Sequence, residues 1–279
     1  MPIKTILVYL PSVKCAQNIM AATAKIAGSR SAHLIGLHVS QPVPLYAELS
    51  AELPPGMFDQ LRGAGRKSAD AVKRVFVESA KASLLDYEWR YVEASFPSDA
   101  AQTMQETHCA DLVICPKAKD ESADPWSDFG EMAVLQSGRP VLMLPSNIPN
   151  ARVGSRIVVA WNNTRESARA VFDSLDFLRD ASTVRAVTLI DNEDQRTSAE
   201  AASAKLLAAL SRHDIAATLE VSFAGGDGAG EMILSRLVDE GCDLLIMGGY
   251  SHSPLRELIF GGASRVILRD TWVPTLVSH

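Results

Sequence analysis

The chain of 279 residues is long enough for two domains of ordinary size, and its 47% hydrophobic and 22% charged residues are typical of a folded globular protein. The formal net charge of −6 disfavours nonspecific binding to nucleic acid or to an anionic membrane, because both need a basic surface. The N-terminal apolar run, residues 6–10, is too short for a signal peptide or a membrane span, so we expect a cytoplasmic protein.

The first half alternates short apolar runs with helical spacing, a pattern typical of strands buried in a parallel sheet. The predicted strands cover residues 4–10, 33–39, 87–92, 111–115 and 140–145. An early helix carries Ile19, Ala22 and Ile26 on one face, and Gly28 is expected to end it. Residues 41–67 are rich in proline and glycine, which predicts a long irregular or partly helical excursion before a helix over 68–84.

The second half repeats the plan. Its predicted strands cover residues 156–161, 184–190, 217–223, 243–247 and 273–277. Asn163 is expected to cap the first helix, because Glu166 follows three residues later. The apolar spacing predicts that Phe172 is buried by this helix and Val238 by the helix that follows residue 228.

The two halves also match in sequence. Residues 109–114 read CADLVI and residues 241–246 read GCDLLI, while Ile6 aligns with Val158. We infer a tandem duplication with a linker at residues 146–154, which predicts domains at 1–147 and 153–279. Alternating strands and helices predict a parallel sheet in each half, with ligands bound at the loops after its first and fourth strands.

Residues 243–269 carry the clearest candidate for a binding loop. An apolar run ends in Gly248 and Gly249, and a second glycine pair, Gly261 and Gly262, opens a helical pattern. Glycine lets the backbone approach a ligand closely, and the free N–H groups of a helix N-terminus favour anions. This layout is suited to phosphate.

With these features the whole chain resembles a tandem universal stress protein. The resemblance implies an α/β fold, with two tandem open parallel five-stranded sheets flanked by helices, strand order 3-2-1-4-5, of the adenine-nucleotide alpha-hydrolase-like type. Nucleotide-binding members of that family carry G-x2-G-x9-G-[ST] after the fourth strand, where glycine backbones and a hydroxyl hold the ATP phosphates. An Asp at the end of their first strand holds the nucleoside.

The second half keeps the spacing of this motif but only part of its identity. Gly248 and Gly261 match the first and third glycines, whereas Ser251 replaces the second glycine and Gly262 replaces the hydroxyl residue. Asn162 takes the place of the Asp. The first half has lost the motif, because residues 116–119, directly after its fourth strand, contain no glycine and residue 11 is a proline.

The resemblance implies that an adenine nucleotide, ATP or AMP, is held weakly and that any Mg²⁺ accompanies the nucleotide. The implied binding residues are Asn162, Asn163, Ile190, Gly248, Gly249, Ser251, Gly261, Gly262 and Ala263. Turn geometry and close packing are the alternative reasons for these glycines and asparagines. The chain has no standard catalytic motif, and its four cysteines and six histidines show no zinc-ligand spacing, so we expect neither an enzyme nor a metal site.

Three functions stay open at this point. The first is a stress-response protein that acts by binding nucleotide. The second is a nonenzymatic interaction protein without nucleotide, whose unknown protein partner would meet residues 41–67 and 120–128. The third is a small-molecule binder with an apolar pocket near residues 41–67. The family also implies that residues 141–144 pair with 275–277, which would make the chain an intrachain pseudo-dimer and leave a further homodimer open.

Overall fold

The computed structural model describes residues 2–40, 57–93, 103–117, 129–224, 228–249 and 262–279. The chain divides into two compact units, one formed by Ile3–Arg139 and the other mainly by Pro140–His279. None of the helices in these described ranges combines the length and the apolar character that crossing a bilayer requires.

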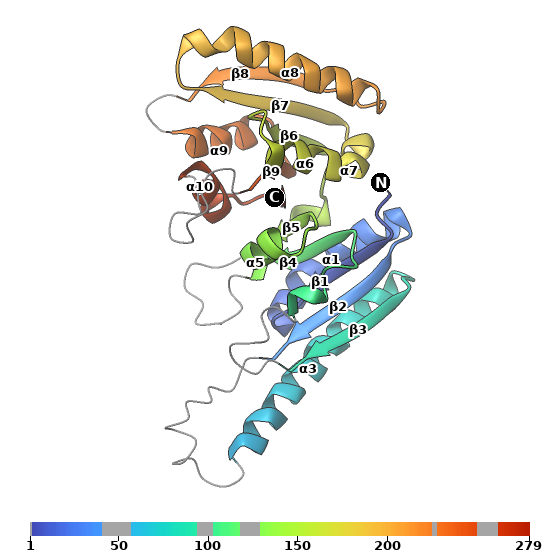
Figure 1. The fold of residues 1–279 in the computed structure, drawn as a ribbon. Helices are drawn as coiled ribbons and strands as arrows, with labels where there is room; N and C mark the ends of the chain where they lie inside the picture. Colours follow the sequence, from blue (N-terminus) through green and yellow to red (C-terminus); the bar gives the residue numbers. More distant parts are fainter. Residues whose placement is uncertain (1, 41–56, 94–102, 118–128, 225–227, 250–261) are drawn as a thin grey trace. The chain divides into compact units, whose positions relative to one another are not determined.

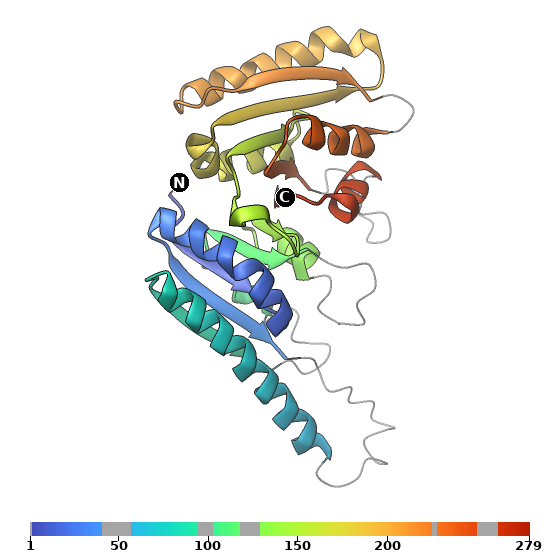
Figure 2. The same cartoon turned by 180° about the vertical axis from the view of Figure 1, so that it is seen from behind.

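The unit Ile3–Arg139 is built on four parallel strands in the order β3-β2-β1-β4. Their bounds are β1 Thr5–Tyr9, β2 His33–Val39, β3 Tyr87–Val92 and β4 Leu112–Pro116. The helices described here are α1 Val13–Arg30, α3 Met57–Ala82 and α5 Phe129–Gln136. Helices α1 and α3 pack together on one face of the sheet, as Figures 1 and 2 show from opposite sides.

The unit formed by Pro140–His279 contains the strand order β5-β10-β9-β6-β7-β8. The strands are β5 Val141–Leu144, β6 Arg156–Ala160, β7 Thr183–Ile190, β8 Thr218–Phe223, β9 Leu244–Gly248 and β10 Thr275–Ser278. The helices are α6 Arg165–Asp173, α7 Leu175–Asp180, α8 Arg196–Ser211, α9 Ala229–Asp239 and α10 Gly262–Asp270, with short 3-10 turns at Pro149–Ala151 and Glu193–Gln195. Helix α9 packs on α10, whereas α6 packs on β9 and β10.

All ten predicted strands are confirmed, and β8-β7-β6-β9-β10 reproduces the expected order 3-2-1-4-5. The expected pairing of residues 141–144 with 275–277 is also confirmed: β5 and β10 are antiparallel, with Leu142 opposite Leu276. Because of this pairing, β5 belongs to the compact unit of the second half. The unit boundary therefore precedes the linker at 146–154, and the domain limits 1–147 and 153–279 remain a prediction drawn from the repeat.

Two predicted helix limits were wrong. Helix α1 continues through Gly28 and ends at Arg30, where Ser31 takes the left-handed conformation with φ 49°. Helix α3 begins at Met57, so the last eleven residues of the 41–67 excursion are helical. A glycine inside a helix costs about 1 kcal/mol relative to alanine, and packing of α3 on α1 offsets the cost of Gly63 and Gly65. Residues 41–56 lie outside the described ranges.

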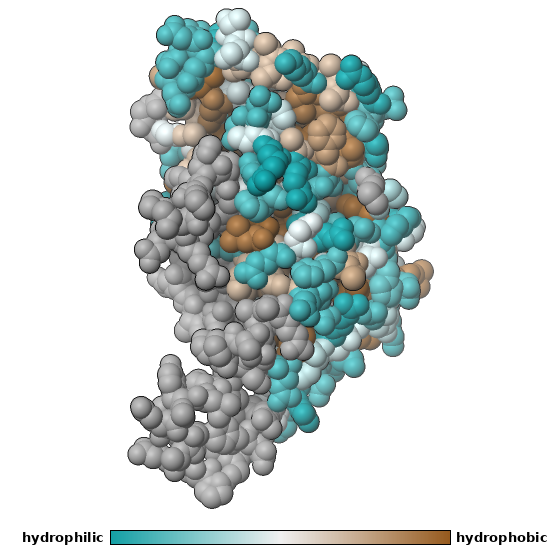
Figure 3. All heavy atoms as spheres, viewed as in Figure 1, coloured by the Kyte–Doolittle hydropathy of each residue, from teal (hydrophilic) through white to brown (hydrophobic). Residues whose placement is uncertain are grey.

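Two predicted core residues are exposed. Phe172 is 41% exposed and Val238 62% exposed, whereas Ala170, Val171 and Leu237 are buried. Helix α6 ends at Asp173 and α7 starts at Leu175, so the apolar spacing that predicted one helix runs across a break. Figure 3, in the view of Figure 1, shows hydrophobic areas separated by hydrophilic side chains over the described surface. Single exposed apolar residues are ordinary on such a surface.

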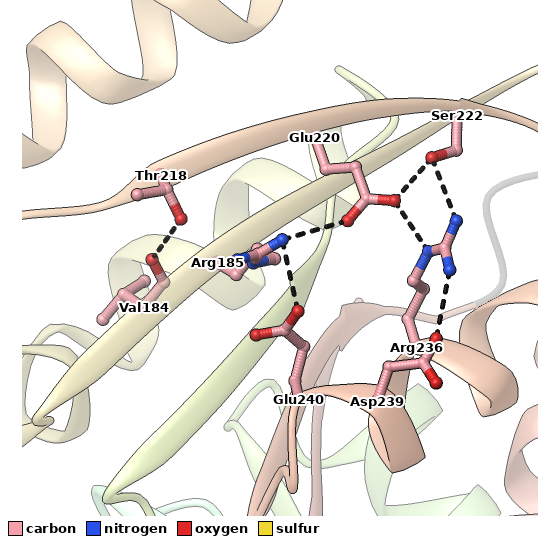
Figure 4. A network of polar contacts seen from close by, with 8 residues as sticks. All are labelled: Val184, Arg185, Thr218, Glu220, Ser222, Arg236, Asp239 and Glu240. Atoms are coloured by element: carbon pink, nitrogen blue, oxygen red, sulfur yellow. Dashed lines mark hydrogen bonds and ion pairs between the residues drawn. The ribbon is translucent and has the colours of Figure 1, made fainter.

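An ionic network attaches α9 to the outer strands β7 and β8 (Figure 4). Glu220 lies between two arginines, 2.7 Å from Arg236 Nε and 3.4 Å from Arg185. Arg185 also lies 3.2 Å from Glu240, and Arg236 lies 3.1 Å from Asp239. Burial alone would raise the pKa of the Glu220 carboxyl, but the Ser222 hydroxyl and the two arginines outweigh it and lower that pKa.

Glu220→Gln is expected to flatten part of the acid dependence of stability. A carboxyl whose pKa is lower in the folded state adds to the free energy of unfolding at pH values above its unfolded-state pKa of about 4.3. This contribution is lost as the pH falls through the folded-state pKa. Urea unfolding at a series of pH values below about 5 checks it: the wild type should lose more stability than the variant. Asp239→Asn, at an exposed ion pair, is the matched control and should follow the wild type.

Candidate functional site

The site lies where the strand order of the second half reverses. Strands β6 and β9 are adjacent and parallel, with Ala160 opposite Met247 at their carboxyl ends. The chain leaves β6 toward β7 on one side and leaves β9 toward β10 on the other. The two connections diverge here, which opens a crevice of the kind that binds ligands in open α/β sheets.

A pocket of about 170 Å³ occupies this crevice. Its apolar walls come from the strand ends and from α9 and α10, and include Ala160, Val187, Leu189, Met247, Ile233 and Ile267. Asn162 and Ser264 supply polar side chains, and Ala229 and Ala263 bring the first turns of α9 and α10 to the pocket. Drug-sized ligands fill pockets of about 300 Å³ or more, so this space suits a single ring system.

The pocket brings together three of the residues proposed from the sequence, namely Asn162, Gly248 and Ala263. Gly262 is the first residue of α10, beside Ala263. Asn163, Ile190 and Gly249 are described but do not line the pocket. Ser251 and Gly261 lie outside the described residues.

Gly248 is required by packing. An added Cβ at this position would stand 2.5 Å from the backbone nitrogen of Ser167 and 2.6 Å from the carbonyl carbon of Glu166. Both atoms belong to the first turn of α6, which lies directly against the end of β9. The glycine that matches the start of the nucleotide motif therefore has a structural reason that is independent of any ligand.

The backbone of Gly249 is already paired with the last residues of the chain. Its N–H donates to the carbonyl oxygen of Ser278 at 2.9 Å. Its own carbonyl oxygen lies 3.1 Å from Nδ1 of His279, which suits an Nδ1–H donor. This N–H group is therefore not available to a phosphate in this conformation.

The turn after β6 differs from the expectation. The N-cap of α6 is Thr164 and not Asn163: the Thr164 hydroxyl accepts from the Ser167 N–H at 3.3 Å, and the Ser167 hydroxyl accepts from the Thr164 N–H at 3.0 Å. Asn163 has φ 57°, which asparagine tolerates better than most residues. The Asn162 amide oxygen accepts from the Thr164 hydroxyl at 2.8 Å, so the helix start orients this side chain.

Strand parity separates Ile190 from the pocket. Side chains alternate between the faces of a strand, and Val187 and Leu189 line the pocket. Thr188 bonds Ser203 of α8 at 3.1 Å, so residues of its parity face α8. Ile190 shares that parity and is buried, and its carbonyl oxygen accepts from the Ala224 N–H at 2.9 Å.

Most of the pocket lining was not proposed from the sequence, and neither was Glu166 beside it. Trp161 lines the pocket with only 7% exposure, and its indole N–H has no hydrogen-bond partner among the described residues. Glu166 is buried in the first turn of α6, 2.9 Å from Arg165. The position of Trp161, directly after a strand beside the expected site, was the available signal in the sequence.

The Glu166 carboxylate places a negative charge at the N-terminus of α6. Burial alone would raise its pKa, but its own backbone N–H, Arg165 and Thr164 outweigh burial and lower that pKa. A helix N-terminus that already holds a carboxylate disfavours a second anion. The α9 and α10 first turns, with Ala229 and Ala263 at the pocket, are better placed to receive one.

The second half can now be assigned. Residues 155–279 match the family model of the universal stress proteins. The second half is thus a universal stress protein domain. No curated relative matches the chain in sequence.

Solved structures extend the likeness to the whole chain. A universal stress protein from Archaeoglobus fulgidus DSM 4304 has a TM-score of 0.76 and 12% identity, over 98% of this chain and 95% of its own. A protein of unknown function from Pseudomonas aeruginosa PAO1 has a TM-score of 0.62 and 17% identity, over 99% and 92%. The cytoplasmic domain of a prokaryotic cation chloride cotransporter has a TM-score of 0.52 and 12% identity, over 98% and 94%. At these identities the likeness establishes the α/β, adenine-nucleotide alpha-hydrolase-like fold alone.

Proposed function

We propose that the chain is a tandem universal stress protein whose second domain binds one adenine nucleotide, AMP or ATP, and acts in the stress response by binding and not by catalysis. The observation that carries this proposal is the pocket at the switch point between β6 and β9. Its size and apolar walls suit the base, with Asn162 beside the nucleoside. The phosphates would extend toward the α10 N-terminus.

The described lining of the pocket is compatible with a binding role. In the described part of the chain, no side chain that lines it is ionisable. The described residues also contain no group of three His, Cys, Asp or Glu side chains that could hold a metal ion. We propose that any Mg²⁺ at this site accompanies the nucleotide phosphates.

Equilibrium dialysis of nucleotide-stripped protein against ATP, ADP and AMP tests the proposal. We expect saturable binding of one nucleotide per chain, with no turnover to product. A protein that takes up none of the three at millimolar concentration does not have this function. That result would favour the interaction protein, whose expected partner surfaces at 41–67 and 120–128 lie mostly outside the described residues.

Asn162→Asp is expected to bind adenosine about fivefold more tightly than the wild type, because a charge-assisted hydrogen bond is roughly twice as strong as a neutral one. An aspartate can still accept from the Thr164 hydroxyl, so the helix start is kept. Isothermal titration measures the change. Asn163→Asp adds the same charge one residue away from the pocket lining and should leave the affinity unchanged. Equal effects of both variants would exclude a direct contact by residue 162.

The pairing of β5 with β10 belongs to the same proposal. We infer that this antiparallel contact, made within one chain, takes the place of the pairing that a second chain would provide. The chain would then be an intrachain pseudo-dimer.

A further inference from the structure

A pair of stacked rings lies at the carboxyl end of the sheet in the first half. Tyr9 is the last residue of β1, and Phe129 is the first residue of α5. Their ring centroids are 3.9 Å apart with an interplanar angle of 13°, and both side chains are 1% exposed. β1 lies between β2 and β4, so its carboxyl end is the point at which the strand order of the first half reverses.

Strand register identifies the residue of the second half that corresponds to Tyr9. Ile6 pairs with Leu112 in the first half, and Ile157 pairs with Leu244 in the second. Ile6 therefore corresponds to Ile157, one residue from the sequence alignment with Val158. Tyr9 then corresponds to Ala160, and each is the last residue of its strand. The next residue repeats the match, since Leu10 N–H donates to Leu37 and Trp161 N–H donates to Val187.

The ends of α5 and α10 identify the residue of the second half that corresponds to Phe129. At the end of α5 the Ser137 N–H donates to the Ala133 carbonyl oxygen at 2.9 Å, and after α10 the Thr271 N–H donates to the Ile267 carbonyl oxygen at 2.8 Å. Ala133 and Ile267 therefore correspond, and both are buried. Four residues before them in the chain, Phe129 corresponds to Ala263.

The two stacked rings thus correspond to two alanines, and both alanines line the pocket of the second half. We propose that the first half keeps a second, latent ligand site, which the rings of Tyr9 and Phe129 fill, and that Ala160 and Ala263 hold the site of the second half open. The ligand class is a small planar aromatic molecule, because the space that one half leaves open is the space that two parallel rings occupy in the other. This inference rests on the correspondence of the halves and not on the proposed nucleotide.

Removing the Phe129 ring should open the latent site. Phe129→Ala leaves an apolar cavity beside Tyr9, and engineered apolar cavities of about 150 Å³ stay dry and bind small aromatic molecules. With indole as the probe, we expect one site in the wild type and two in Phe129→Ala. Indole should also raise the melting temperature of this variant more than that of the wild type. Phe129→Leu keeps most of the buried volume and should retain one site.

The reciprocal change should close the site of the second half. Ala263→Phe is expected to bind no indole, and the double variant Phe129→Ala/Ala263→Phe to bind one. Stoichiometry by isothermal titration, with circular dichroism to establish folding, gives the readout. A folded Phe129→Ala with one site, or an Ala263→Phe that still binds one, would overturn the inference. If Phe129→Ala does not fold, Ala263→Phe decides alone. A wild type that binds indole but no AMP would reject the proposed nucleotide and leave this inference standing.

Discussion

Gly248→Ala is expected to destabilise the second half by more than about 3 kcal/mol. The new methyl group would lie 2.5 Å and 2.6 Å from backbone atoms of Ser167 and Glu166, and backbone in a helical turn cannot move aside as a flexible side chain can. Relief requires α6 to shift away from β9, which would disturb the packing of α6 on β10 as well. Guanidinium unfolding followed by circular dichroism measures the loss.

Gly63→Ala is the matched control for this substitution. Gly63 lies inside α3, and a Cβ there meets no atom within 4 Å. The alanine should stabilise the chain by about 0.5–1 kcal/mol through helix propensity. If Gly248→Ala were as stable as the wild type, the close contact of β9 with α6 would be wrong. Weaker nucleotide binding by Gly248→Ala could not by itself be interpreted as a lost phosphate contact.

Gly248 also illustrates how far the sequence predicts the site. The glycine motif flanks the pocket, because the end of β9 and the first turn of α10 both line it, and apolar runs identified all ten strands. The sequence offered a phosphate contact or close packing as the reason for Gly248, and the structure shows close packing against the helix that begins after β6. Ser167 and Gly248 are eighty-one positions apart in the chain, so no local pattern contains that contact.

The wrong N-cap after β6 and the position of Ile190 away from the pocket have local causes. Asn163 and Thr164 are both good helix caps, and the choice between them depends on which one has the extended backbone of an N-cap. Leu189 and Ile190 are both apolar, and only strand parity sends one to the pocket and the other toward α8. Sequence patterns place such residues within one position, which is too coarse for a binding site.

The first half shows a different limit. The loss of the glycine motif predicted that the first half has no nucleotide site. It did not predict which side chains occupy the position that corresponds to the pocket of the second half. Tyr9 and Phe129 are read as ordinary apolar residues in the sequence, and their stacking depends on the register of β1 and on where α5 begins. The missing motif and the stacked rings are two independent reasons to expect one ligand per chain.

Asp243→Ala is expected to destabilise the second half by about 3 kcal/mol, because hydrogen bonds to charged groups contribute about 1.5–3 kcal/mol each and are not additive. One oxygen of this carboxylate accepts from three successive backbone N–H groups, those of Gly154, Ser155 and Arg156, at 3.1, 2.8 and 2.8 Å. The side chain is 19% exposed, so water replaces these bonds only in part. The loss would free the start of β6, the strand that ends at the pocket.

The chain supplies its own controls for Asp243. Asp111 occupies the matching place in the first half and accepts from two backbone N–H groups, those of Lys4 and Thr5, at 2.8 and 2.9 Å. Asp111→Ala should therefore lower the free energy of unfolding less than Asp243→Ala does. Asp243→Asn keeps an acceptor oxygen and should lower it less than either alanine variant. Arg152→Ala removes the partly exposed ion pair at 3.3 Å and the hydrogen bond that the guanidinium donates to the Ser155 hydroxyl, and it should cost less than about 1 kcal/mol. Chemical denaturation ranks the four variants, and hydrogen exchange at Ser155 and Arg156 should quicken in Asp243→Ala alone. A larger loss in Arg152→Ala than in Asp243→Ala would show that the ion pair, and not the backbone bonds, fixes the start of β6.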